Sequence, residues 1–179
     1  MKRYLTLTSW LAVALLGSVA LGSVAVRLSF EQLVQQSDRV VVARVQKCES
    51  AWGPEHRLIH TTCSFDVEQE VAGAGAKRFQ IVQPGGAVGR LAQRTHGYPT
   101  FREGQAGLLL FLHRSEHGFR VVGLSQGVFF LHRDAGRQLA IQRLEGLDFL
   151  KDDGRPLILT AAEAFARIRA LWKDRVLER

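Results

Sequence analysis

The chain is 179 residues long and has a formal net charge of +7, from 24 basic and 17 acidic residues. Hydrophobic residues make up 46% of it and charged residues 23%, which is typical of a folded globular protein and excludes a disordered or low-complexity chain. The length suits a single domain, alone or with a short appendage.

The first 26 residues have the pattern of a secretory signal peptide. A short basic start is followed by an uncharged apolar stretch over residues 4–26, and the small residues Ser23 and Ala25 form a cleavage motif. We expect cleavage after Ala25, which would remove residues 1–25. The alternative is an uncleaved membrane anchor, because residues 4–26 are long enough to cross a bilayer. Both alternatives export the domain, to the periplasm or out of the cell, and membrane contact is expected only if residues 4–26 are retained.

Two strands with a short helix before them are predicted next. Ser29 and Gln32 have the S-x-x-Q spacing of a capping box, which predicts a helix over residues 30–36. The β-branched apolar run at residues 39–48 predicts a buried strand. Apolar and polar residues alternate over residues 60–71, which is typical of a strand with one face in water.

Cys48 and Cys63 are the two cysteines of the chain. An even number of cysteines in an exported protein predicts a disulfide, and the two residues lie where a hairpin would bring them together. Because side chains alternate between the faces of a strand, a bond between them requires a bulge near Lys47. A metal site is not expected here, because the paired C-x-x-C spacing of structural zinc sites is missing.

The second half of the chain predicts further strands and a final helix. A third strand is expected over residues 79–83. Residues 85–105 are the longest stretch without a clear period, and such a loop is often functional or covers one end of a fold. The apolar periodicity and a second capping box then predict four strands and a helix, at residues 107–112, 119–122, 128–131, 139–141 and 160–177.

This order of elements predicts a mainly β fold. We expect a small antiparallel OB-like β-barrel with a short N-terminal helix and a C-terminal amphipathic helix, because Gly123 interrupts a strand as at a barrel corner. The predicted organisation is a signal peptide or anchor at residues 1–25, a barrel domain at residues 27–145, and a linker with a helix at residues 146–179.

Several motifs between Phe30 and Arg133 resemble those of a group of uncharacterised exported bacterial proteins. The shared patterns are an F-x-x-L-V-x-x-S/A-D-x-V-V-V start, a G-G loop, an F-x-x-G turn, an L-L-F-L strand and a V-V-G-x-x-Q-G strand. Here they begin at Phe30, Gly85, Phe101, Leu109 and Val121.

The start of this region is also remotely similar to the OB-like module of tissue inhibitors of metalloproteinases and netrin C-terminal domains. That resemblance implies a barrel. The inhibitors act through an N-terminal cysteine on the protease zinc, and no cysteine lies near Ala25, since the first one is Cys48. The resemblance therefore implies the fold and not the inhibitory chemistry.

No catalytic motif stands out from the sequence. His113 and His117 flank a predicted turn, but H-E-x-x-H is missing, so exposed turn histidines are expected, with no metal and no cofactor. The serines lack a G-x-S-x-G elbow. The acidic residues of the strand at 60–71 fit a solvated face.

The sequence analysis favours an exported, non-catalytic binding module whose ligand is unknown. The contact surface is expected in the stretch 85–105, with Arg90, Arg94, Tyr98 and Arg102 as contributors. A protein or an anionic envelope component is the expected partner because the chain is basic, and nucleic acid is not expected after export. The alternatives are an inhibitor of an exported protease and a hydrolase with an unrecognised site.

The predicted processing can be tested with one measurement. The measurement is the intact mass of the protein, purified from the envelope fraction under non-reducing conditions. We expect this mass to equal that of residues 26–179 less two hydrogens. Retention of residues 1–25 would favour the anchor, and a mass without the loss of two hydrogens would contradict the disulfide.

Overall fold

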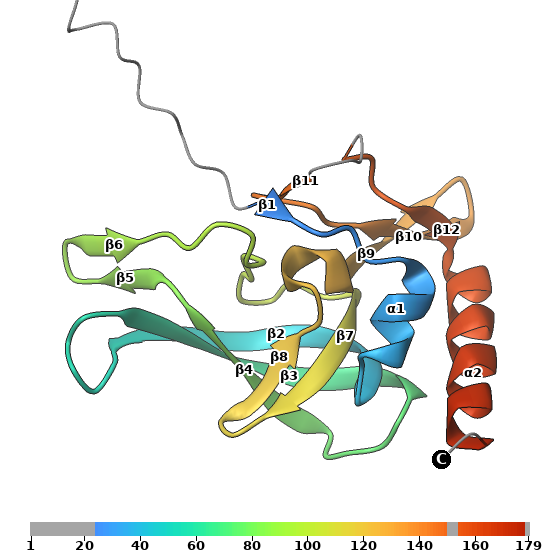
Figure 1. The fold of residues 1–179 in the computed structure, drawn as a ribbon, viewed down its shortest axis with the longest axis horizontal. Helices are drawn as coiled ribbons and strands as arrows, with labels where there is room; N and C mark the ends of the chain where they lie inside the picture. The colour runs from blue at the N-terminus through green and yellow to red at the C-terminus, as the bar shows by residue number, and fades with distance from the viewer. Residues whose placement is uncertain (1–23, 150–153, 178–179) are drawn as a thin grey trace, which may run out of the picture.

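The computed structural model describes residues 24–149 and 154–177. The predicted signal peptide lies outside the described residues except for its last two, Val24 and Ala25, which form the short strand β1. The described part of the chain is mainly β, with a large sheet and two helices at its side (Figure 1). No helix in the described ranges combines the length and the apolar character needed to cross a membrane.

Eight strands form one mixed sheet in the order β12-β10-β9-β7-β2-β3-β4-β8. β7 also pairs with β8, so the pairings lead from β7 through β2, β3, β4 and β8 back to β7. In chain order, the bounds of these strands are β2 Arg39–Trp52, β3 Ile59–Ala72, β4 Arg78–Pro84, β7 Leu108–Ser115, β8 Gly118–Val121, β9 Val128–Asp134, β10 Arg137–Gln142 and β12 Ile158–Thr160.

One pairing in this sheet is parallel, so the expectation of a wholly antiparallel arrangement is wrong. β4 and β8 pair in parallel at Ile81 and Phe119, whereas the other neighbours in the sheet are antiparallel. The reason is topological. β7 is antiparallel to β2 and β8 is antiparallel to β7, so β8 must run in the same direction as β2 and β4.

The stretch 85–105, predicted to lack regular structure, contains a short hairpin. β5 (Gly86–Val88) and β6 (Leu91–Gln93) pair in antiparallel fashion. Each strand has three residues, too few for an alternating apolar pattern to be visible in the sequence. A further two-stranded pair joins β1 to β11 (Asp148–Phe149) in parallel.

The predicted capping box is confirmed at helix α1 (Phe30–Gln35). Ser29 Oγ accepts a hydrogen bond from Gln32 N at 3.2 Å, and Gln32 Oε1 accepts one from Ser29 N at 2.8 Å. Helix α2 (Ala161–Leu177) begins after Thr160, whose Oγ1 accepts from Glu163 N. A 3-10 helix over Leu124–Gly127 follows Gly123, which has a positive φ of 63° and so ends strand β8.

Two clusters of buried side chains make up the core, one on each side of the β2–β7 pair. The first contains Phe30 and Val34 of α1, alternate residues of β2 and β7, and Ala164 and Ile168 of α2. The second contains the other residues of β2 and β7 together with side chains of β3, β4 and Phe101. Because α2 contributes to the first cluster, it covers the core rather than hanging free.

Arg39 is a buried cation at the start of β2, with only 2% of its surface exposed. Its Nε and Nη2 donate to the two carboxylate oxygens of Glu70 at 2.8 and 2.7 Å, and Nη2 also donates to Ala76 O at 2.9 Å. The pair ties β2 to β3 and to the turn that leads into β4. A buried charge needs such partners, since losing one of them leaves it desolvated and unpaired.

We expect Glu70→Ala to lower the free energy of unfolding by about 2 kcal/mol, because it leaves the Arg39 guanidinium without its carboxylate. Arg78→Ala is a matched control, because the Arg78–Asp66 pair joins β4 to β3 with an 85% exposed arginine. The control should change stability by less than about 1 kcal/mol. Urea unfolding measures both, and equal losses would contradict the structural role of Arg39.

Candidate functional site

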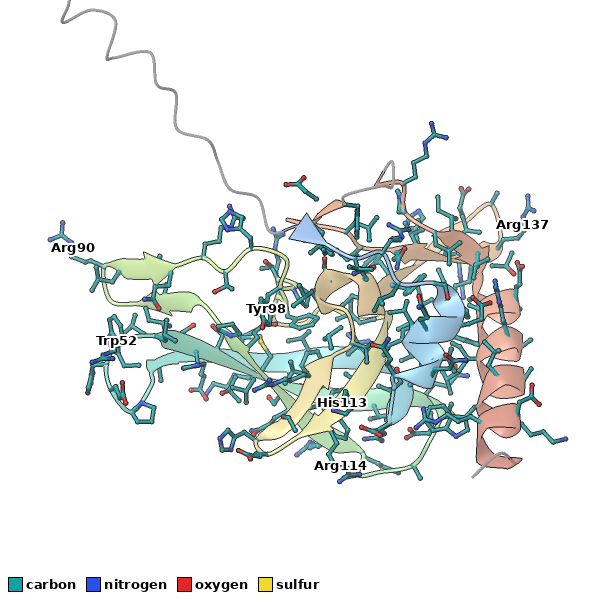
Figure 2. The ribbon with its side chains drawn as sticks, viewed as in Figure 1. Trp52, Arg90, Tyr98, His113, Arg114 and Arg137 are labelled. Carbon is teal, nitrogen blue, oxygen red and sulfur yellow. A yellow bond between two sulfur atoms is a disulfide. The ribbon has the colours of Figure 1, made fainter. Side chains whose placement is uncertain are left out.

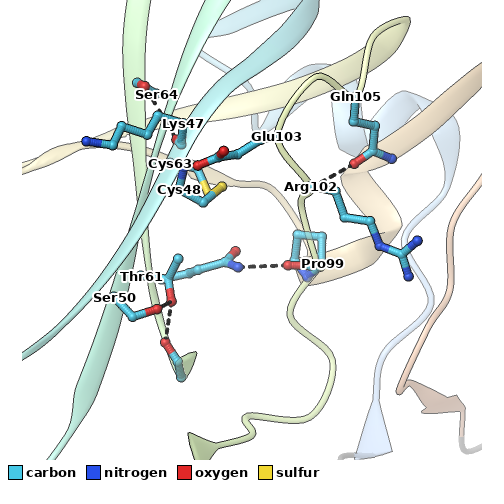
Figure 3. Close-up of a disulfide and its surroundings, with 12 residues drawn as sticks. Lys47, Cys48, Ser50, Thr61, Cys63, Ser64, Pro99, Arg102, Glu103 and Gln105 are labelled. Atoms are coloured by element: carbon cyan, nitrogen blue, oxygen red, sulfur yellow. Dashed lines mark hydrogen bonds between the residues drawn. A yellow bond between two sulfur atoms is a disulfide. The ribbon is translucent and has the colours of Figure 1, made fainter. Parts of the chain in front are cut away.

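The predicted disulfide is confirmed. Cys48 of β2 and Cys63 of β3 are bonded and lie directly opposite each other, with their Cα atoms 4.1 Å apart (Figure 3). The register of the two strands shifts between Val45 and Lys47, which is the bulge that the alternation of faces required. Without this shift, the two cysteines would point to opposite faces.

The disulfide lines a groove of about 570 Å³, called the disulfide groove below. One side is formed by the ends of β2, β3 and β4, including Ser50, Thr61 and Gln83. The other side is formed by residues 93–101 and by Glu145 and Gly146. The groove therefore combines the rigid hairpin with a segment of the stretch 85–105.

Close backbone packing at β5 holds the outer wall of this groove against the hairpin. Thr61 Oγ1 donates to Gly85 O at 2.7 Å and lies 2.9 Å from Ser50 Oγ. At Gly86 a Cβ atom would lie 2.3 Å from Thr61 Oγ1 and 2.4 Å from Ser50 Oγ, and φ is +136°. Only glycine fits there, so the double glycine in the sequence marks a close approach of two segments.

Gln83 holds the segment 94–101, the second part of the groove's outer wall, against β4. Its Nε2 donates to Pro99 O at 2.8 Å, which ties β4 to the segment 94–101. Its Oε1 is buried and has no hydrogen-bond partner among the residues that the structure describes. Ser125 N donates to Gly97 O at 2.9 Å, which anchors the same segment to the 3-10 helix.

The structure brings together two of the four residues predicted to contact a partner. Arg94 and Tyr98 line the disulfide groove. Arg90 lies in the turn between β5 and β6, far from Tyr98 (Figure 2), and Arg102 points away from the disulfide (Figure 3). Whether any of the four contacts a partner stays a prediction.

A second groove, of about 600 Å³, adjoins the first and was not predicted from the sequence. We call it the histidine groove. It shares Gln83, Pro84 and Tyr98 with the disulfide groove. Its charged and titratable side chains besides Tyr98 come from β3 and from the β7–β8 hairpin: His60, His113, Arg114, Glu116, His117 and Arg120.

The sequence indicated part of this second groove. The spacing of His113 and His117 around a predicted turn indicated that the two could approach each other. His60 joins them because β3 pairs with β4, and β4 pairs with β8. That last pairing is parallel and far apart in sequence, and nothing in the local pattern indicated it.

The described residues contain no group of three or more His, Cys, Asp or Glu side chains placed to hold a metal ion. His113 Nδ1 lies 2.9 Å from Asp38 Oδ2, as in a histidine oriented by a carboxylate. No serine, threonine or cysteine in the described ranges is hydrogen-bonded to that histidine. The absence of catalysis stays a prediction.

Comparison with known proteins finds no matching family model, no similar curated protein and no similar solved structure.

Removal of the disulfide should destabilise the wall of the groove. We expect Cys48→Ala/Cys63→Ala to lower the free energy of unfolding by about 3 kcal/mol, because the bond closes a loop of 15 residues. The wild-type protein with its disulfide reduced is the control and should unfold at the same urea concentration as the double variant. A reduced wild type as stable as the oxidised one would contradict this role.

Proposed function

We propose that this chain is an exported, non-catalytic binding module built on an OB-like barrel, and that the disulfide groove binds an anionic component of the cell envelope. The disulfide is in keeping with an oxidising compartment. The cleavable leader that the proposal requires rests on the sequence pattern of residues 1–25.

The ring of pairings supports the OB-like barrel. Five strands, β7, β2, β3, β4 and β8, pair in a cycle, with β4 and β8 as its parallel pair. The second core cluster contains buried side chains of β2, β3, β4 and β7, among them Val41, Phe65, Ile81 and Leu110, and the partly buried Phe119 of β8 packs against it. A cycle of five strands around a shared apolar interior is the architecture of a small barrel filled by its own side chains.

The charge of the disulfide groove carries the binding proposal. Glu145 is its one carboxylate, and this carboxylate is paired with Arg143. Arg94 has no ion pair within the described ranges, so its positive charge in the groove is not compensated. Tyr98 adds a half-buried ring to the wall. An uncompensated arginine beside polar groups and an aromatic ring favours an anionic ligand.

Substitution of three arginines in the stretch 85–105 tests whether the disulfide groove binds anions. We expect Arg94→Ala to weaken binding of dextran sulfate about fivefold, while Arg90→Ala and Arg102→Ala stay within about twofold, because only Arg94 lines the groove. Isothermal titration calorimetry measures all three, with neutral dextran as the uncharged probe. Equal losses in the three variants would indicate general electrostatic attraction and contradict the site, as would no binding by the wild type.

A further inference from the structure

The histidine groove has positive side chains of its own. Arg120 is exposed and forms no ion pair or hydrogen bond through its side chain within the described ranges. The Arg114 guanidinium lies over the ring of Phe119, 5.7 Å from its centre, and has no carboxylate partner there. Both cations are therefore available to an anion that enters the groove.

Two acidic side chains lie near these cations. Glu116 lines the groove. Asp38 lines a neighbouring hollow, where its Oδ2 lies 2.9 Å from His113 Nδ1 and accepts from Arg114 N at 2.8 Å. Tyr98 faces the groove from the segment 94–101. Arg175 of α2 lines a neighbouring hollow with His113 and Arg120, and its guanidinium is bonded to backbone carbonyls of residues 34–37.

Three histidines also line the groove. His60 comes from β3, His113 from β7 and His117 from the turn before β8. Imidazole is the side chain that ordinarily gains a proton between pH 8 and pH 5. The other charged side chains that line the groove are two arginines, Arg114 and Arg120, and one carboxylate, Glu116.

We propose that the two grooves form one binding track for an acidic polysaccharide, and that the histidine groove strengthens binding as the pH falls below neutrality. This inference rests on the function proposed for the disulfide groove. The grooves meet at a shared wall of Gln83, Pro84 and Tyr98, and each has the volume of a site for a single small ligand. A ligand that fills both must be extended.

The lining favours a sugar polymer over a membrane or a protein. The exposed large apolar side chains in the described ranges are Val26, Leu58, Leu91 and Ile158, and none of them lines either groove. Insertion into lipid and the core of a protein interface both need such side chains. Amide, hydroxyl and guanidinium groups beside Tyr98 suit the hydroxyls and acidic groups of a polysaccharide.

The test measures the affinity of the processed protein, residues 26–179, for dextran sulfate at pH 7.5 and pH 5.5. Dextran sulfate is the probe because its sulfate groups stay charged at both pH values. We expect the dissociation constant of the wild type to fall about tenfold at the lower pH. His60→Gln/His117→Gln should abolish most of this change, so that the dissociation constants at the two pH values differ by less than about threefold. His113 is left in place because it is bonded to Asp38.

His132→Gln is the matched control, because His132 is exposed on β9 and lines neither groove. It should keep the full pH dependence. Loss of the pH dependence in His132→Gln, or its persistence in the double histidine variant, would overturn the inference. Circular dichroism and urea unfolding confirm that both variants fold.

Further binding measurements distinguish a failure of this inference from a failure of the proposed function. Arg94→Ala should weaken binding at both pH values and leave the ratio of the two affinities unchanged. An unchanged affinity in this variant would contradict the proposed function and with it the single track, whereas a pH dependence that survives the double histidine variant would contradict the further inference and leave the proposed function standing. Phosphatidylglycerol vesicles and polyglutamate test the other anionic surfaces. Binding to either one with the same dependence on His60 and His117, and tighter than binding to dextran sulfate, would overturn the assignment to a polysaccharide.

Discussion

The structure depends on two adjacent strands that are buried on both faces. In β2, Val40 and Val42 belong to one core cluster, and Val41, Ala43 and Val45 belong to the other. The residues of β7 divide in the same way. Because neither face of this pair can be left in water, α1 and α2 must cover one side and the remaining strands of the ring the other. The second cluster reaches the surface at Cys63 and Phe101, which line the disulfide groove, so the groove is built on the end of the core.

Much of this fold could be predicted because its signals are local. Continuous apolar runs indicated that β2 and β7 are buried, and the spacing of Ser29 and Gln32 predicted the start of α1. The even number of cysteines predicted the disulfide, and the alternation of faces then required the bulge beside Lys47. The hairpin β5–β6 and the pairs β1–β11 and β10–β12 were missed, because two or three residues do not show a period and their pairing is decided by distant parts of the chain.

The candidate site was predicted less well, for the same physical reason. The stretch 85–105 does contribute a wall to a groove, but its arginines diverge because the β5–β6 hairpin turns Arg90 away from Arg94. The histidine groove depends on the parallel pairing of β4 with β8, which brings His60 beside residues more than fifty positions later in the chain. Contacts between residues so far apart follow from the order in which the strands pair. The local pattern of a single sequence does not predict that order.

The Arg175 side chain has a consequence for the order in which the protein can fold. It donates hydrogen bonds to Val34 O and Gln35 O, the last two carbonyls of α1, and to Ser37 O just after the helix, up to 141 residues earlier in the chain. Because a chain is synthesised from its amino end, α1 is made well before Arg175, which donates these hydrogen bonds. The long β2–β3 hairpin can form from consecutive residues, whereas the helical side of the core closes last. Since Ala164 and Ile168 belong to the first core cluster, that side of the core stays open to water until α2 has been synthesised.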